Sequence, residues 1–509
     1  MMKKRIALII AAAVAFVALL VTYFVFISPI INEKAPEEEI KLLEGEVLGE
    51  GKSLMMFDQI ERANISSIEV HNSYGSYTFF YDEKQKDFFI KDYLSSPYSK
   101  DMISSLVTAA GNPITMTRVT EKAEDMKEYG LAEENDPAYY IITSKDNITH
   151  KVYIGNMIPT GAGFYARLDG RDAVYVVEAS IKQTLLAPVS NIISPMLFLP
   201  TSQSNYFAVK DFILAKDGKA FLKITSETET KKDSSGKDYE DFLGYKMQFP
   251  AEYSVSSNFD NLLQGFMECY GTSVVVVGKD DEKIPDETLE KYNLKNPAYE
   301  LMFEHGGIKN DILISEKKDG VYYAYSLLFN IICAMDETTF GFLEWELIDF
   351  IDKPLLQYNI DDISSITVTS KDFEETFVLY VTEGETTTNP VTGAVTTKNN
   401  LQVKMKSSDK FVQSPEDFRY FYMGILTTNL VTYAGVEDET GLECLATLKV
   451  VTRSGKKIEY AFYPYKSRCC FYTLNGEGEF YVLTDAVEKM VNDAKKVING
   501  EPVDYKSKD

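Results

Sequence analysis

The chain has 509 residues, 45% of them apolar and 25% charged, a balance typical of folded protein that argues against a disordered chain. Lys and Arg total 52 against 77 Asp and Glu, so the net charge is -25, and such an acidic surface disfavours nucleic acid as a partner. A chain of this length is too long for one hydrophobic core, and the usual domain size predicts about three or four domains.

The amino-terminal segment is the most apolar part of the chain. Residues 6–28 are predicted to form a transmembrane helix because they carry no charge and are long enough to cross a bilayer. The side chains expected to anchor the helix are apolar: Ile6, Phe16, Leu19, Leu20, Phe24 and Ile27. A cleaved signal peptide is the alternative, because Ala13-Val14-Ala15 matches a small-x-small cleavage pattern.

Charges on either side of this segment predict its orientation. Residues 1–5 contain Lys3, Lys4 and Arg5 and are expected to be cytoplasmic, whereas an acidic run, residues 37–39, follows the helix. The sequence therefore predicts a single-pass protein of the cell membrane with an extracytoplasmic body.

Residues 29–57 are predicted to be a stalk or linker. Within them, residues 46–53 resemble the end of a phosphate-binding loop, but Glu46 occupies the position of the first glycine of that motif. A carboxylate there would repel the phosphates, so no phosphate site is expected.

Internal repeats organise the rest of the chain. Ile65-Ser66-Ser67-Ile68 recurs as Ile363-Ser364-Ser365-Ile366, an offset of 298 residues, which corresponds to two periods. We predict three repeat units, at residues 58–202, 203–358 and 359–504, followed by a tail at residues 505–509.

Two further landmarks recur within the predicted units. Tyr129-Gly130-Leu131 returns as Tyr292-Asn293-Leu294, and Gly or Asn at the central position suits a helix carboxy-terminal cap. Asp169-Gly170 and Asn475-Gly476 predict tight hairpin turns, whereas the middle unit lacks that glycine and predicts a looser turn around Asn330.

Alternating apolar runs precede one amphipathic stretch in each unit, which predicts helices at residues 102–110, 259–267 and 418–426. The predicted fold class is therefore α+β: a transmembrane helix followed by three units of mainly antiparallel sheet with helices. Polar inserts at residues 230–236 and 386–400 are expected between the second and third strands of their units.

No residue pattern predicts catalysis, a cofactor or a metal site. The five cysteines form no C-x-x-C pair, and adjacent Cys469 and Cys470 are expected on opposite faces of a strand. The three histidines are isolated, so a Ser-His-Asp site would arise only by accident of folding. Carboxylate pairs such as Glu344 and Glu346 are expected on solvated surfaces. We therefore predict a protein that is not an enzyme.

Aromatic residues cluster on predicted strands. Tyr77, Phe79 and Tyr81 alternate on one strand, and a similar group occupies residues 322–325. Packing into a sheet core is the expected role, with stacking on sugars as the alternative. No surface-recognition residue is predicted.

These landmarks carry a resemblance to a known family. With Ile65-Ser66-Ser67-Ile68, Tyr129-Gly130-Leu131 and Val152-Tyr153-Ile154-Gly155, the chain resembles the family called domain of unknown function 4340 across most of residues 58–504. The resemblance implies a membrane-anchored extracytoplasmic protein associated with an ABC-type export system, with no known reaction.

The expected function is thus a scaffold or binding protein that accompanies an ABC-type transport system. Its expected partners are a permease, an ATPase or a related auxiliary membrane protein, and no cofactor is expected. The alternative is a module that binds cell-envelope polysaccharide, and a hydrolase is a third and weaker reading.

Overall fold

The structure, a computed structural model, describes residues 40–199, 209–266, 270–388, 395–433 and 441–504. Its contacts divide the chain into two compact units. In the described residues, unit 1 comprises residues 40–88 and 104–187, and unit 2 comprises residues 89–103 and 188–504.

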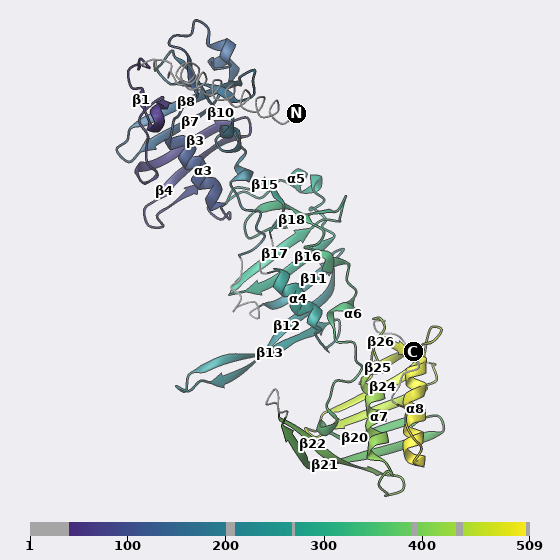
Figure 1. Cartoon of the computed structure of the whole chain (residues 1–509). Coiled ribbons are helices and arrows are strands. Elements are labelled where there is room, and N and C mark those ends of the chain that lie inside the picture. The colour runs from purple at the N-terminus through teal and green to yellow at the C-terminus, as the bar shows by residue number, and fades with distance from the viewer. Residues whose placement is uncertain (1–39, 200–208, 267–269, 389–394, 434–440, 505–509) are drawn as a thin grey trace, which may run out of the picture. The chain divides into compact units, whose positions relative to one another are not determined.

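Antiparallel sheet dominates the described residues (Figure 1). Strands pair into three large sheets of eight, nine and seven strands and one small two-stranded sheet, β1 (Val47–Leu48) with β2 (Leu54–Met55). Every pairing between these strands is antiparallel, as expected for strands joined by short turns.

The first large sheet has the order β5-β4-β3-β7-β8-β9-β10-β6. Its strands are β3 (Ile65–Asn72), β4 (Gly75–Asp82), β5 (Asp87–Ile90), β6 (Thr117–Thr120), β7 (Ala138–Ser144), β8 (Thr149–Met157), β9 (Gly163–Leu168) and β10 (Val174–Glu178). Helix α3 (Lys100–Gly111) turns Ile103, Leu106, Val107 and Ala110 into the core.

The second large sheet has the order β14-β13-β12-β11-β16-β17-β18-β19-β15. Its strands are β11 (Lys210–Lys216), β12 (Lys219–Lys232), β13 (Asp238–Phe249), β14 (Tyr253–Ser254), β15 (Ser273–Val277), β16 (Tyr299–His305), β17 (Ile308–Ile314), β18 (Val321–Ser326) and β19 (Ile331–Asp336). The α-helices of this region are short: α4 (Ser257–Phe266), α5 (Asp286–Lys291) and α6 (Leu347–Phe350).

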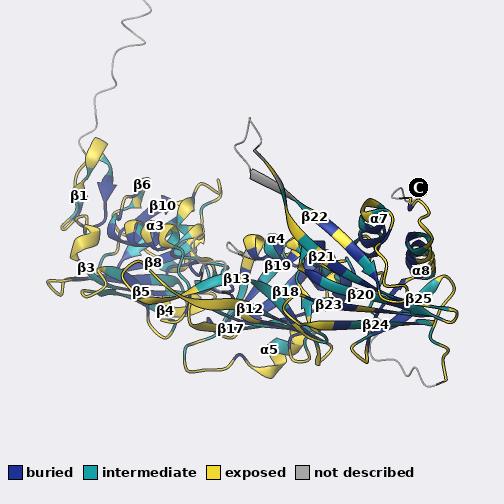
Figure 2. Ribbon diagram, turned by 90° about the horizontal axis from the view of Figure 1, so that it is seen from below, coloured by how far each residue is buried: buried dark blue, intermediate teal, exposed yellow. Residues whose placement is uncertain are grey.

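The third large sheet has the order β22-β21-β20-β23-β24-β25-β26. Its strands are β20 (Ile363–Ser370), β21 (Phe373–Thr388), β22 (Val395–Met405), β23 (Ala446–Thr452), β24 (Lys457–Pro464), β25 (Cys469–Leu474) and β26 (Glu477–Leu483). Helices α7 (Pro415–Leu426) and α8 (Thr484–Asn499) cover one face of it, and Figure 2 shows their buried residues turned toward the strands.

The Ile-Ser-Ser-Ile segments begin the central strands of the first and third sheets, and they pack in the same way. Ile65 and Ile363 are fully buried. Ser66 Oγ donates to the carbonyl oxygens of residues 143 and 144 at 3.0 and 3.3 Å, and Ser364 Oγ donates to those of residues 451 and 452 at 2.8 and 3.2 Å. In both sheets the register with the neighbouring strand shifts at this serine. The serine hydroxyl therefore supplies a hydrogen bond to backbone carbonyl groups at the place where the strand pairing is irregular.

Two glycines of the family-like segments meet in unit 1. Gly130 adopts φ 69° and ends the 3₁₀ turn Met126–Tyr129, while Gly155 lies on β8. A Cβ atom on Gly155 would lie 2.2 Å from the Tyr129 carbonyl oxygen, and one on Gly130 would lie 2.5 Å from Asn156 Oδ1. The turn and the strand therefore cross so closely that a side chain at Gly155 would force the backbone apart.

The corresponding turn of unit 2 has Asn293 at the position that Gly130 occupies in unit 1. Asn293 adopts φ 56°, and the leucine after it, Leu294, is fully buried like Leu131. Asn tolerates the left-handed conformation better than most residues. The predicted role of Gly or Asn at this position is confirmed.

Most predicted helices and inserts are found where the sequence placed them. The stretches 102–110, 259–267 and 418–426 correspond to α3, α4 and α7. The polar inserts fall at the β12–β13 and β21–β22 connections, between the second and third strands of their sheets. On β25, Cys470 is buried and Cys469 half-buried, and both are reduced.

The hairpin turns agree in part. Asn475 and Gly476 both have positive φ and join β25 to β26 by a two-residue turn, and Asn330 has φ 53° between β18 and β19. The turn at Asp169-Gly170 is longer than predicted because β10 begins only at Val174. Arg171, which lies between them, extends toward residues 40–57, where its Nη1 donates to the Met56 carbonyl oxygen at 2.9 Å.

The predicted fold class, α+β led by a transmembrane helix, is wrong. The structure is mostly antiparallel sheet, and the helical segments before Gly130 and Asn293 are only a four-residue 3₁₀ turn and a six-residue helix. In the described part of the chain, no helix is both long enough and apolar enough to cross a membrane.

The predicted membrane localisation is corrected on the same finding. The expected helix at residues 6–28, with Ile6, Phe16, Leu19, Leu20, Phe24 and Ile27, lies outside the described residues, as does the predicted tail at 505–509. The described residues therefore give no support for a single-pass anchor.

Residues 40–57, expected within a stalk, are folded against the first sheet. Leu54, Met55, Met56 and Phe57 are at most 7% exposed. One buried carboxylate, Glu46, lies between this segment and the sheet.

Glu46 is enclosed by donors from three parts of unit 1. Arg118 Nη1 donates to Oε2 at 2.5 Å, Tyr175 donates to Oε1 at 2.7 Å, and the Leu43 backbone N–H donates at 2.7 Å. Burial acts to raise the pKa of Glu46, but these hydrogen bonds and the charge of Arg118 outweigh it, so the pKa is lowered. Glu46 thus fastens the segment to β6 and β10 as a carboxylate.

Candidate functional site

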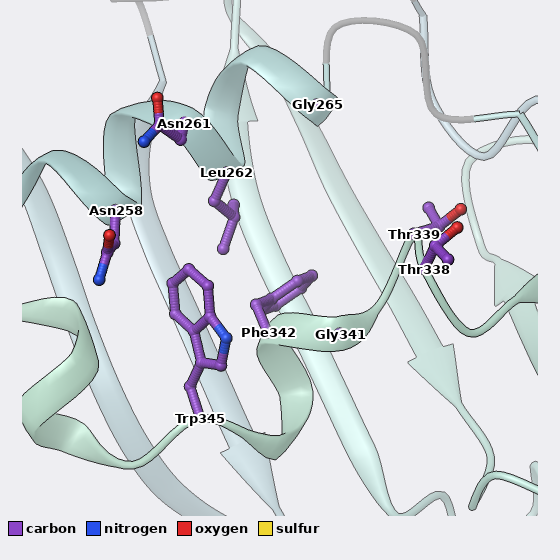
Figure 3. A pocket seen from close by; sticks show the side chains of 9 residues that line it. All are labelled: Asn258, Asn261, Leu262, Gly265, Thr338, Thr339, Gly341, Phe342 and Trp345. Carbon is purple, nitrogen blue, oxygen red and sulfur yellow. The ribbon is translucent and has the colours of Figure 1, made fainter.

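A cavity of about 570 Å³ lies in unit 2 between α4 and the segment that follows β19 (Figure 3). This volume falls within the range of about 300–1,000 Å³ typical of ligand pockets. Helix α4, the loop after β19 and the 3₁₀ turn Gly341–Glu344 with the next residue supply its lining: Asn258, Asn261, Leu262, Gly265, Thr338, Thr339, Gly341, Phe342 and Trp345. None of these lining residues is charged.

The apolar wall of the cavity is built around Trp345, the only tryptophan of the chain. Figure 3 shows its indole between Asn258 and Phe342, with Leu262 of α4 next to it. Trp345 is half-buried, whereas Phe342 and Leu262 are only 4% and 9% exposed. Part of the Trp345 indole is therefore exposed to the cavity, and the buried side chains of Phe342 and Leu262 form the apolar base.

The position of Trp345 is fixed by its neighbours. Its ring packs edge-on against Phe350 of α6, with centroids 5.1 Å apart. Its carbonyl oxygen accepts a hydrogen bond from Lys216 Nζ at 2.9 Å. Glu346 and Asp349 cap α6 immediately after it. The tryptophan is thus held between a capped helix and β11.

Helix α4 presents different sides to the core and to the cavity. Phe259 is fully buried and packs against Phe212 and Tyr245, each at a centroid distance of 5.1 Å. Asn258 and Asn261 are exposed. The amphipathic spacing that predicted this helix therefore also places two amides at the cavity.

Two polar groups of the lining have part of their bonding capacity occupied. Asn258 Nδ2 donates to the Asp349 carbonyl oxygen at 3.1 Å, which directs the amide while its Oδ1 remains an acceptor. Thr338 Oγ donates to Asp336 Oδ1 at 2.6 Å, so its lone pairs remain as acceptors. The cavity thus offers neutral groups suited to ligand hydroxyls.

Unit 1 contains a serine, a histidine and an aspartate close together. His71 Nδ1 lies 2.7 Å from Ser76 Oγ, and its Nε2 lies 3.7 Å from Asp136 Oδ1. His71 and Ser76 are paired across the β3–β4 hairpin, which by itself explains their contact. Asp136 is 90% exposed and beyond hydrogen-bonding distance, so the group lacks the buried orienting carboxylate of a hydrolase triad.

The other groups weighed from the sequence have structural partners. Tyr77, Phe79, Tyr322 and Tyr325 are buried and Tyr81 and Tyr323 are half-buried, so the core role predicted for these aromatics is confirmed. Glu344 pairs with Lys317. Within the described part of the chain, no cluster of three or more His, Cys, Asp or Glu residues could hold a metal ion.

The Asp280 carboxylate has three hydrogen-bond donors. Asp280 accepts hydrogen bonds from the Leu94 N–H at 2.6 Å, the Ser95 N–H at 2.9 Å and Ser95 Oγ at 2.6 Å. Burial acts to raise its pKa, but these bonds lower it overall. Within unit 2, Asp280 thus tethers the loop before α3.

The second sheet also carries an exposed two-stranded extension, residues 225–245, which we call the ribbon (Figure 1). β12 pairs with β11 only up to Ile224, so beyond that residue it pairs only with β13. Tyr239 and Leu243 on the ribbon are 46% and 59% exposed. An isolated two-stranded hairpin is marginally stable in water, so the ribbon depends on the sheet from which it extends.

Asp233 organises the tip of the ribbon. Its Oδ1 accepts from the Ser235 N–H, Ser235 Oγ and the Lys237 N–H at 2.8, 2.6 and 3.0 Å, and Gly236 adopts φ 83°. The hydrogen bond from Ser235 Oγ and those from the backbone lower the pKa of Asp233. The ribbon is therefore an ordered hairpin with an Asx-type turn.

Neither the Trp345 cavity nor the ribbon was identified from the sequence. The polar insert at residues 230–236 contains the tip of the ribbon, and the expected role of such an insert is a mobile loop, with a recognition loop as the alternative. The single tryptophan of the sequence, Trp345, does not by itself indicate a cavity.

Comparison with known families identifies one match. The model of the family described as Domain of unknown function (DUF4340) matches residues 90–297. The resemblance expected from the sequence is thereby confirmed over this range, which is narrower than residues 58–504. No curated protein and no solved structure matches the chain.

Proposed function

We propose that this chain, whose residues 90–297 match the DUF4340 family, is a binding scaffold that presents the ribbon to a protein partner. The ribbon is the observation that carries this proposal. The ribbon extends past the sheet to which it belongs, and it exposes Tyr239 and Leu243. Strand β14 pairs with β13 only at residues 246 and 247, so the outer edge of β13 within the ribbon has no pairing with β14.

The free edge of β13 offers backbone donors and acceptors to an added strand. Such edges are templates for pairing, and charged side chains commonly protect them from aggregation. The ribbon carries such charges: Lys231 pairs with Asp241 at 2.5 Å, and Thr230 binds Glu240 at 2.7 Å. Selective pairing with one partner, through strand addition and the two apolar side chains, fits this surface.

The partner we propose is a permease or ATPase of an ABC-type transporter. The support for this choice is the family resemblance, which implies work beside an export system. A second candidate function, saccharide binding, is favoured by the uncharged cavity beside Trp345.

Shortening the ribbon tests the scaffold role. Ser226 and Tyr245 face each other across the hairpin, so replacing residues 227–244 by Asn-Gly closes it with a two-residue turn. Tyr245 keeps its contact with Phe259, so the melting temperature should stay within about 3 °C of the parent value. Copurification of transporter subunits after crosslinking in cells, measured by mass spectrometry, should be lost.

A second variant tests the contribution of two ribbon side chains to partner binding and keeps the ribbon backbone. Tyr239→Ser with Leu243→Ser should reduce the recovered partner at least about fivefold if the two side chains contribute at an interface. Tyr74→Ser, at an aromatic that is 68% exposed in the β3–β4 turn, is the matched control and should change nothing. Unchanged recovery after ribbon shortening would refute the proposal.

A further inference from the structure

The cavity beside Trp345 combines an indole ring with neutral hydrogen-bonding groups. Amide and hydroxyl side chains both donate and accept hydrogen bonds, as sugar hydroxyls do. A sugar ring also has C–H faces that pack on aromatic rings, whose apolar body and polar tip suit amphipathic ligands. Asn258, Asn261 and Thr338 supply the first kind of contact and Trp345 supplies the second.

The charges around the cavity are directed to other partners. Glu344 pairs with Lys317, Glu346 caps α6, and Asp336 accepts from Thr338. A lining without a cation provides no counter-charge for a phosphate or carboxylate ligand. The lining therefore favours an uncharged ligand over a nucleotide or an anionic sugar.

The base of the cavity is packed by aromatic side chains from several elements. Phe342 is packed against Phe212 and Phe340, with centroids 6.4 and 6.2 Å away, and Trp345 is fixed by Phe350 and Lys216. Sites on supported side chains lose less entropy on binding than sites on mobile ones.

We propose that this cavity is a binding site for a neutral oligosaccharide, with one sugar ring stacked on Trp345 and its hydroxyls bonded to Asn258, Asn261 and Thr338. The inference rests on the second candidate function, saccharide binding, and it is independent of the ribbon and its partner.

The chain contains its own reporter for this site. Trp345 is the only tryptophan among 509 residues, so tryptophan fluorescence reads the cavity alone. Titration of the full chain with cellohexaose, mannohexaose and chitohexaose should give a saturable change in emission with at least one of them. Polygalacturonate, an anionic polysaccharide, should give none.

Variants that keep Trp345 identify the contacts. Asn261→Ala and Thr338→Ala should each weaken the affinity about fivefold, the effect of losing one net hydrogen bond. Gln264→Ala is the matched control, because Gln264 is an exposed amide on the same helix that does not line the cavity. The ribbon-shortened chain should bind as the parent does.

Calorimetry on the same samples distinguishes two negative results: saccharide binding at a place other than this cavity, and no saccharide binding at all. Heat of binding without a fluorescence change would place the saccharide elsewhere and overturn the assignment of this cavity. Neither signal with any of the three neutral hexasaccharides would overturn saccharide binding, while leaving the ribbon proposal standing. Equal weakening by Asn261→Ala and Gln264→Ala would also refute the site.

Discussion

Arg118→Ala is expected to destabilise unit 1 by about 3 kcal/mol, because it leaves the buried Glu46 carboxylate without its cation. The side chain of Glu46 is 0% exposed and that of Arg118 is 13% exposed, so water cannot readily replace the lost partner. The expected structural result is release of residues 41–57 from β6 and β10. Hydrogen exchange of peptides from that segment, together with thermal unfolding, measures both effects.

A matched control lies on the same arginine. Glu121 also pairs with Arg118, at 3.2 Å, but it is 53% exposed, so Glu121→Ala should cost less than about 0.5 kcal/mol. If the two variants exchange at the same rate in residues 41–57, the role given to Glu46 is wrong.

The pH dependence follows from the lowered pKa of Glu46. Because the folded-state pKa lies below the ordinary value of 4.5, the Glu46 pairing stabilises the folded state above that pH and its contribution is lost as the pH falls through the folded-state pKa. In Arg118→Ala, protonation of Glu46 removes the buried negative charge that has lost its cationic partner. The stability gap between parent and variant should therefore narrow on acidification.

Gly155→Ala is expected to destabilise unit 1 by about 3 kcal/mol, at the upper end of overpacking effects. The added Cβ would lie 2.2 Å from the Tyr129 carbonyl oxygen, and 3.0 Å from a Leu131 side-chain carbon, so the backbone must shift. Thermal unfolding followed by circular dichroism measures the loss. Gly265→Ala on α4 is the control, because its Cβ would meet nothing within 4 Å.

A neutral result for Gly155→Ala would show that the crossing of the turn and β8 relaxes cheaply. The close approach would then not explain the glycines of the Tyr-Gly-Leu and Val-Tyr-Ile-Gly segments. A loss seen equally in Gly265→Ala would point to a general effect of the substitution.

Local patterns predicted the elements that depend on neighbouring residues. The Ile-Ser-Ser-Ile strands, helices α3, α4 and α7, the Asn475-Gly476 turn and the β12–β13 connection are each fixed by the spacing of residues within one segment. Alternating apolar positions set which face of a strand is buried, so the core aromatics were also predicted.

Features that join distant segments escaped prediction. Glu46 binds Tyr175 across 129 residues, so nothing near Glu46 marks it as buried. The Trp345 cavity takes its wall from residue 258 at one end and residue 345 at the other. The Asp169-Gly170 turn lengthens because Arg171 reaches Met56, a contact that the local turn signal does not contain.

Site-specific photocrosslinking at position 239 is the most direct test of the scaffold role. A photoreactive phenylalanine analogue in place of Tyr239 should yield a covalent adduct with a transporter permease or ATPase in cells. The same analogue in place of Tyr74 should not. Adducts from neither position, or the same proteins from both, would contradict the claim that the ribbon binds a partner.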